Sequence, residues 1–348
     1  MAEIRVLELF AGIGACSKAL TNLGIPHKIV DAVEIDPYAI KAFNAIHGTS
    51  FEAQDITQWD KPLENIDLLM HGSPCQDFSV AGKQKGGDQN SGTRSSLMYE
   101  TLRIVEKLHP RVVIWENVKN LLSEKHRHNF DAYLSAMEEL GYHNAYKVLN
   151  AKDFGVPQNR ERVFTVSILK RSPFYFDYQF PTPRPLGKNL MSILEPEVDK
   201  KYYLTEKQLA SLSVASADTV SRTVRTSGRS SLDRHTWDVV KVSRVGGLYD
   251  KPGRRHQAGS IYDANGIAAT LSTMQGGNQE PIITGPPCVR RLTPLECWRL
   301  MSFDDADFDK AKETGLSDAQ LYKQAGNSIV VKVLEAILAN LTEVFAHA

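Results

Sequence analysis

The sequence predicts an α/β protein with a mostly parallel, doubly wound, Rossmann-like sheet and a second, smaller domain. Three observations support this prediction. Apolar runs of strand length alternate with helical patterns as far as about residue 170. The connections between them are short, which is typical of a parallel sheet covered by helices. After that point the alternation stops, and proline, aromatic and glycine residues become frequent.

Five apolar runs predict the strands of the sheet. Each is short, nearly continuous and rich in valine, isoleucine and leucine, as expected for strands buried on both faces. In chain order the runs are IRVLELF, KIVDAVEI, IDLLMHG, RVVIWEN and RVFTVSIL. We therefore expect strands at 4–10, 28–35, 66–72, 111–117 and 162–169.

Helical spacing of apolar residues predicts the helices between these strands. One of them begins at Pro37, because proline is favoured in the first helical turn. Another ends at Gly24, because glycine is favoured just after a helix. We expect helices at 14–24, 37–47, 95–109 and 129–141, and a last one within 321–345.

The middle of the chain predicts the smaller domain. The segment PFYFDYQFPTPRPLG has the composition of a linker, and glycine-rich turns with short β-like runs follow it. The C-terminal helix suits the first domain better than the second. We expect a first domain at 1–185, an irregular β-rich domain at 186–288, and a return to the first domain at 289–348.

Composition excludes several classes of protein. No apolar run approaches the roughly 20 residues that span a bilayer, and the start MAEIRVLELF lacks the pattern of a signal peptide. The four cysteines show no CxxC spacing, which argues against a disulfide framework and against a cysteine zinc site. We therefore expect a cytoplasmic protein with no metal and no membrane partner.

Charge is distributed unevenly along the chain. The formal net charge is zero, yet residues 219–256 carry nine Arg or Lys against three Asp, an excess of +6. Within this stretch lie Arg222, Arg225 and Arg229. A solvated face would explain a short basic run, but an excess of this size in a neutral protein favours a surface that binds a polyanion such as nucleic acid.

A glycine-containing turn predicts a nucleoside cofactor site. Gly12 and Gly14 lie between the first strand and the first helix, where backbone can approach a ligand closely. Glu34 ends the next strand, where it can accept hydrogen bonds from ribose hydroxyls, and Asp55 suits an adenine amino group. Ser17 replaces the third glycine of the dinucleotide pattern GxGxxG, which disfavours a nicotinamide cofactor. The alternative is a glycine turn without a ligand.

Two residues at the predicted ligand edge of the sheet suggest covalent catalysis. Cys75, in HGSPCQDFSVAG, follows the strand at 66–72, and Glu116 ends the strand at 111–117. A thiolate adds to electron-poor carbon, and a carboxyl can protonate the ring nitrogen that gains charge. Arg160 and Arg162 suit a phosphate or a carboxylate. The alternatives are a small buried cysteine, a helix-capping glutamate and a surface salt bridge.

Together these motifs resemble the bacterial and phage DNA (cytosine-5)-methyltransferases, in family order and over nearly the whole chain. FAGIG resembles the S-adenosylmethionine loop, and VEIDP the strand whose acid holds the ribose. GSPCQDFSVAG resembles the catalytic loop, ENV the glutamate motif and QNRERV the paired-arginine motif. RRLTPLECWRLMSF resembles the segment that supports the recognition domain, GIAATLSTMQGG its Thr-Leu element, and QAGNSIVVKVL the closing motif.

The resemblance implies a reaction and a set of site residues. Cys75 would add to carbon 6 of a flipped-out cytosine in duplex DNA, Glu116 would act at ring nitrogen 3, and S-adenosyl-L-methionine would supply the methyl group. Arg162 would lie near the cytosine carbonyl oxygen, while Arg160 would hold the loop or a phosphate. The implied cofactor residues are Phe10, Gly12, Gly14, Glu34, Ile35, Asp55, Ile56, Pro74, Leu97 and Asn327. The implied DNA-binding residues are Ser79, Arg222, Arg225, Arg229 and Thr270.

Three other functions stay open at this point. A tRNA cytosine-5 methyltransferase of the same fold is the nearest, although a recognition region of about 100 residues favours DNA. A nucleotide-dependent oxidoreductase is disfavoured by the missing third glycine, and an inactive DNA-binding regulator by the intact Cys75, Glu116 and Arg162. We expect a monomer that associates with the nucleoid through DNA and that a restriction endonuclease could accompany.

Overall fold

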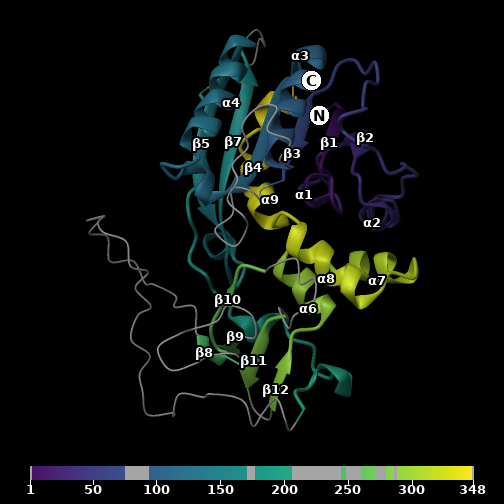
Figure 1. Ribbon diagram of the computed structural model, residues 1–348, viewed down its shortest axis with the longest axis vertical. Helices are drawn as coiled ribbons and strands as arrows, with labels where there is room; N and C mark the ends of the chain where they lie inside the picture. Colours follow the sequence, from purple (N-terminus) through teal and green to yellow (C-terminus); the bar gives the residue numbers. More distant parts are fainter. Residues whose placement is uncertain are drawn as a thin grey trace.

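The structure is a computed structural model that describes residues 2–74, 94–170, 177–205, 244–247, 260–271, 280–285 and 288–346. Its larger part is a sheet flanked by helices, and a smaller sheet lies at the opposite end of the molecule from α3 and α4 (Figure 1). Within the described residues, no helix is both long and apolar enough to cross a membrane.

Six strands form the large sheet in the order β2-β1-β3-β4-β7-β5. β1 pairs in parallel with β2 and β3, and β3 pairs in parallel with β4, whereas β7 is antiparallel to both β4 and β5. The mainly parallel α/β prediction is therefore confirmed. The strands are β1 Ile4–Leu9, β2 His27–Val33, β3 Leu68–His71, β4 Val112–Val118, β5 Tyr142–Asn150 and β7 Glu161–Leu169.

Helices cover both faces of the large sheet, because its strands are apolar on both sides. On β1, Val6 packs in a core with α1 (Ala15–Asn22) and α9 (Val331–Ala339). Leu7 points to the other face and packs in a core with α3 (Met98–Leu108) and α4 (Arg127–Glu139). This alternation of successive residues is what a doubly wound sheet requires.

The C-terminal helices lie against the N-terminal part of the chain. α9 packs against α1, and α7 (Asp305–Glu313) packs against α2 (Pro37–His47). α6 (Pro294–Leu300) begins with a capping box, in which the Thr293 hydroxyl and the Glu296 carboxyl each bind the other's backbone N–H. Between α6 and α9 lies α8 (Asp318–Asn327), and α10 (Thr342–Ala346) follows α9. These helices bring the segment around Asn327 to the edge of the large sheet.

The smaller sheet has the order β12-β11-β9-β8. A small core of Leu204, Ile261 and Ile282 supports it. A separate parallel pair joins β6 (Gln158–Asn159) of the large part to β10 (Ala268–Ala269). The strands are β8 Arg244–Gly247, β9 Ser260–Asp263, β11 Ile282–Gly285 and β12 Cys288–Arg291.

One strand of the large sheet is absent from the sequence-based prediction. β5 has the sequence YHNAYKVLN and borders the sheet beside β7. Only Tyr142 and Leu149 of its nine residues are buried. An edge strand with so many polar residues carries no apolar run, so the periodicity that identifies buried strands does not find it.

Candidate active site

The carboxyl ends of β1, β3 and β4 meet at one edge of the sheet, beside the segment between α8 and α9. An open cleft lies there, lined by Phe10, Gly12, Glu8, Glu116 and Asn327 among others. In open α/β sheets, ligands bind at this edge. The structure therefore brings Gly12 of the predicted turn, Glu116 and Asn327 to one cleft.

The turn after β1 has an unusual backbone. Phe10, Gly12 and Gly14 all have positive φ, at 52°, 55° and 79°. A Cβ added at Gly12 would meet nothing within 4 Å, whereas one at Gly14 would lie 2.1 Å from Nε2 of His47. Gly14 thus allows α1 to approach α2, and Gly12 leaves open space beside the cleft.

Glu34 holds this turn to the end of β2. One carboxylate oxygen accepts a hydrogen bond from the backbone N–H of Gly12 at 2.9 Å, and the other accepts one from Asp36 at 2.9 Å. Burial raises the pKa of Glu34 above its ordinary value, and these backbone donors oppose the rise. Each oxygen keeps a second lone pair, so the carboxylate can also accept a hydrogen bond from a ligand hydroxyl.

Glu8 is a residue of the cleft that the sequence analysis missed. It lies within β1, is buried, and accepts hydrogen bonds from the backbone N–H of Ser17 at 3.1 Å and from the Ser17 hydroxyl. Burial raises its pKa from 4.5 to about 7. The sequence does contain a sign of this site, because Glu8 is an acid inside an otherwise apolar run. A carboxyl is rarely buried unless it is paired or hydrogen-bonded.

The other predicted cofactor residues are not among those that line the cleft. Ile35 follows β2 and is 68% exposed, although it is apolar. The Asp55 carboxylate accepts hydrogen bonds from the backbone N–H and hydroxyl of Thr57, both at 2.9 Å, while the neighbouring Ile56 is buried. Leu97 ends a short 3-10 helix before α3, and Pro74 is half-buried after β3.

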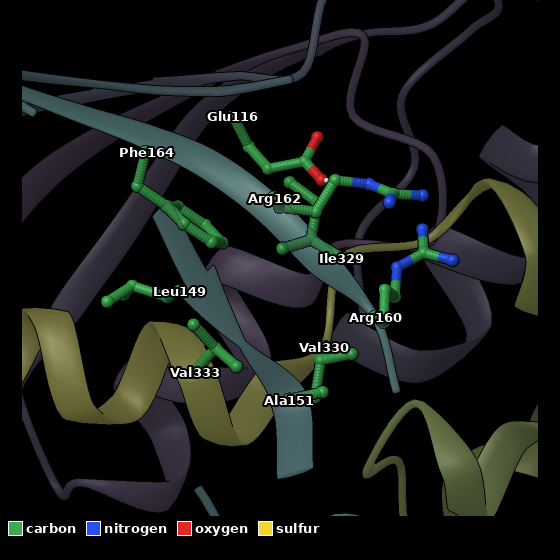
Figure 2. Close-up of a pocket in the computed structure, with 9 residues that line it drawn as sticks. All are labelled: Glu116, Leu149, Ala151, Arg160, Arg162, Phe164, Ile329, Val330 and Val333. Atoms are coloured by element: carbon green, nitrogen blue, oxygen red, sulfur yellow. Dashed lines mark ion pairs between the residues drawn. The ribbon is translucent and has the colours of Figure 1, made fainter. Parts of the chain in front are cut away.

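Glu116 and Arg162 face each other at the mouth of a second, small hollow (Figure 2). The Nε atom of Arg162 lies 3.0 Å from Oε1 of Glu116. The Nε–H bond does not point along this line, so Oε1 is a buried acceptor without a hydrogen bond among the described residues. Charge holds the pair together while a hydrogen-bonding position stays open on the carboxylate.

Arg160 has a different environment from Arg162. It is buried, and its guanidinium donates to the backbone carbonyls of Leu271 at 3.3 Å, Gly326 at 3.3 Å and Ser328 at 2.8 Å. Arg160, which lies between β6 and β7, therefore contacts both the segment after β10 and the segment before α9. The sequence analysis gave the two arginines different roles, with Arg160 at the loop or a phosphate, but it did not identify these three carbonyl partners.

Of the remaining predicted residues, the structure places Thr270, and five others lie outside the described part of the chain. The Thr270 hydroxyl donates to the carbonyl oxygen of Asn159 at 2.9 Å, beside the β6–β10 pair. The described residues contain no group of three or more His, Cys, Asp or Glu side chains suited to a metal ion. The predicted residues that lie outside the described part of the chain are Cys75, Ser79, Arg222, Arg225 and Arg229.

Known proteins share this architecture and its sequence pattern. The family described as C-5 cytosine-specific DNA methylase matches residues 4–343. The type II methyltransferase M.HhaI of Haemophilus parahaemolyticus is 33% identical, covering 98% of this chain and 95% of that protein. The orphan methyltransferase M.SPRI of Bacillus phage SPR is 30% identical, covering 100% of this chain and 99% of that protein.

Two solved structures have the same fold. The Schizosaccharomyces pombe Dnmt2 methyltransferase superposes with a TM-score of 0.67 at 19% identity, covering 98% of each chain. The Entamoeba histolytica methyltransferase EhMeth superposes with a TM-score of 0.69 at 16% identity, again covering 98% of each chain. At these identities the likeness concerns the fold.

Proposed function

The chain belongs to the C-5 cytosine-specific DNA methylase family, and we propose how its residues carry out the reaction. It transfers a methyl group from S-adenosyl-L-methionine to carbon 5 of a cytosine in double-stranded DNA, through a covalent adduct with Cys75. The observation that carries most weight is the open acceptor on Glu116, which is buried beside Arg162 at the ligand edge of the sheet.

The cleft suits the proposed cofactor. Space lies open beside Gly12, the Glu34 carboxylate has spare lone pairs, and the exposed Ile35 offers an apolar surface to an aromatic base. Glu34 would bind the ribose hydroxyls, and Phe10 would lie against adenine. Asp55, Ile56, Pro74, Leu97 and Asn327 would complete the site.

Cysteine addition makes carbon 5 of cytosine reactive. The Cys75 thiolate forms a bond to carbon 6, and the electron pair of the ring double bond moves toward nitrogen 3, where the Glu116 carboxyl donates its proton. Carbon 5 is now the nucleophilic end of an enamine. When bound, S-adenosylmethionine supplies the methyl group to it. Loss of the carbon 5 proton then expels the thiolate, and the nitrogen 3 proton returns to Glu116.

The two arginines divide the remaining work. Arg162 holds the Glu116 carboxylate at 3.0 Å and would donate to the carbonyl oxygen of the cytosine. Arg160 keeps its three backbone contacts and acts as a positioning residue for the segment that contains Asn327.

DNA binding would involve the smaller domain. We propose the division 1–185, 186–288 and 289–348, with Arg222, Arg225 and Arg229 neutralising phosphates and Thr270 near the DNA. The target base would leave the helix, since its carbon 6 cannot be reached inside a duplex, and Ser79 would belong to the loop beside it. A tRNA substrate is less well supported. The matching family is described as a DNA methylase, and relatives such as M.HhaI are named type II methyltransferases.

Bisulfite sequencing tests the proposal in cells that otherwise lack cytosine methylation. Expression of the chain should leave 5-methylcytosine at one short sequence, and Cys75→Ser should leave none. Unmodified DNA in both cultures, with the protein folded and present, would contradict the proposed function.

We further propose a monomer that works at the nucleoid in the cytoplasm. Some of its relatives are named orphan methyltransferases and others type II methyltransferases. Sequencing the neighbouring genes would show whether a restriction endonuclease accompanies this protein.

A further inference from the structure

Ser73 lies just after β3 and is held by two side chains of the neighbouring strand β4. The indole N–H of Trp115 donates to Ser73 Oγ at 3.0 Å. The side-chain amide of Asn117 donates to the Ser73 carbonyl oxygen at 3.2 Å and lies 3.3 Å from Oγ. All three residues are buried, so water is poorly placed to replace a lost bond.

The two donors are the immediate neighbours of Glu116 in the sequence. Successive strand residues point to opposite faces, and Trp115 packs in the core with α3 and α4. Glu116 points the other way, toward the cleft, where a Cβ added at Gly72 would lie 3.7 Å from its Oε2. The hydrogen bonds to Ser73 thus lock the end of β3 in register with Glu116 without using the Glu116 carboxylate.

The Trp115 indole is itself held in place by its neighbours. The His71 ring lies parallel to it, with ring centroids 5.6 Å apart and planes 6° from parallel. Tyr133 packs against the same indole at 4.1 Å, and its hydroxyl lies 2.9 Å from Nε2 of His71. Burial lowers the pKa of His71 to about 3, so the ring stays neutral near neutral pH. The donor to Ser73 is therefore part of a rigid, uncharged cluster.

We infer that Ser73 is a positioning residue for the methylation reaction, and that its bonds to Trp115 and Asn117 hold the start of the cysteine-bearing segment against Glu116. This inference rests on the proposed function, in which Cys75 is the nucleophile. Cys75 follows Ser73 by two positions, so covalent geometry alone keeps the two Cα atoms within about 7 Å. An anchor at Ser73 consequently restricts where the thiol can lie relative to the carboxyl that donates the proton.

Ser73→Ala tests the inference, because it removes the hydroxyl that accepts from Trp115 and leaves the rest of the chain intact. We expect the rate constant for adduct formation with 5-fluorocytosine DNA, measured at saturating DNA and cofactor, to fall by about 10- to 100-fold, the scale for a small misplacement of reacting groups. The dissociation constants for DNA and S-adenosylmethionine should stay at the wild-type values. Trp115→Phe, which removes the same bond from the other side, should slow the reaction too.

A double variant separates this bond from general damage. If Ser73→Ala and Trp115→Phe act through one hydrogen bond, the double variant should be little slower than the slower single variant. Ser167→Ala is the matched control, because Ser167 is buried in the same sheet and its hydroxyl donates to Asn144 at 2.6 Å. The control should lower thermal stability without changing the rate constant of adduct formation.

The outcomes distinguish the inference from the function on which it rests. Adduct formation by wild type and by Ser73→Ala with the same rate constant would overturn the inference and leave the proposed function standing. A smaller amplitude with an unchanged rate constant would also overturn it, since that pattern means loss of folded protein. Absence of any adduct in wild type would instead contradict the proposed function.

Discussion

The Nε atom of Arg162 lies 3.0 Å from Oε1 of Glu116, and this carboxylate oxygen has no hydrogen bond among the described residues. The two side chains come from the adjacent antiparallel strands β4 and β7, in which Val118 is paired with Arg162. Strand pairing therefore fixes the positions from which a cation and a carboxyl reach the same point at the mouth of the second hollow. A cytosine placed there would meet both groups at once.

Glu116→Gln should slow adduct formation by about 100-fold or more, the usual scale for removing a general acid. The amide keeps the size of the side chain and can still lie beside Arg162, but it cannot donate a carboxyl proton to nitrogen 3. Single-turnover trapping on 5-fluorocytosine DNA measures this rate constant. Binding of S-adenosylmethionine should be unchanged, and a wild-type trapping rate in Glu116→Gln would remove the carboxyl from the mechanism.

Glu34→Ala should weaken S-adenosylmethionine binding by about 1–3 kcal/mol, the scale for hydrogen bonds to a charged group. Because Glu34 also holds the Gly12 turn, part of this loss could come from the turn alone. Calorimetry with a 2′-deoxyribose analogue of the cofactor separates the two causes. Wild type should bind the analogue more weakly than the cofactor, whereas Glu34→Ala should not distinguish them; equal discrimination in both proteins would contradict a ribose contact.

Gly14→Ala should destabilise the folded protein more than Gly12→Ala. Both positions have positive φ, which costs an alanine about 1–2 kcal/mol. At Gly14 the new Cβ would also lie 2.1 Å from His47 Nε2 and 2.8 Å from Phe43, so overpacking adds about 1–3 kcal/mol. Urea unfolding without cofactor measures the difference. Equal losses at the two positions would show that α1 and α2 can separate without cost.

Glu8 should make stability fall as pH rises between about 4.5 and 7. Below 4.5 the carboxyl is protonated in the folded and the unfolded chain. Between 4.5 and about 7 only the unfolded chain loses the proton, because burial raises the pKa of Glu8 in the folded protein to about 7. Above 7 both forms are ionised, and this contribution becomes constant.

Glu8→Gln isolates that contribution, since its amide oxygen can still accept the hydrogen bonds from Ser17. Urea unfolding at pH 5 and pH 8 gives the free energies to compare. The loss of stability between these pH values should be larger in wild type than in Glu8→Gln, by up to about 3 kcal/mol. Identical pH dependence in the two proteins would mean that Glu8 ionises normally in the fold.

The fold class could be predicted from the sequence, because the buried strands and the helices that cover them have strong apolar patterns. The helix predicted at 37–47 is α2 with the same bounds, and the strand predicted at 4–10 differs from β1 by one residue. The polar edge strand β5 left no such pattern. The antiparallel direction of β7 was equally hidden, because apolar spacing records burial and not direction.

Site residues were predicted where a residue type suited to the chemistry ends or follows a predicted strand. Glu116 and the glycine turn met this condition, and Glu116 and Gly12 line the cleft. The role of Arg160 depends on backbone carbonyls more than one hundred positions away in the chain, which no local motif contains. Ser73 is held by side chains of the neighbouring strand β4, and Glu8 contacts Ser17 of α1, so both residues are recognised only from three-dimensional contacts.

Trapping with 5-fluorocytosine tests whether Cys75 forms a covalent bond to carbon 6 of cytosine. Fluorine cannot leave carbon 5 as a cation, so the adduct cannot resolve after methyl transfer. Duplex DNA with 5-fluorocytosine at the target should give a complex that survives denaturing electrophoresis, and Cys75→Ser should give none, because a serine hydroxyl is barely ionised at neutral pH.

Peptide mass analysis of the trapped complex completes that measurement. The modified base should map to Cys75, and trapping should stay intact when Cys16, Cys288 or Cys297 is changed to Ser. Trapping on 5-fluorocytosine tRNA but not on DNA would keep the chemistry and change the substrate. A complex that persists in Cys75→Ser, or one that maps to another cysteine, would contradict the covalent role of Cys75.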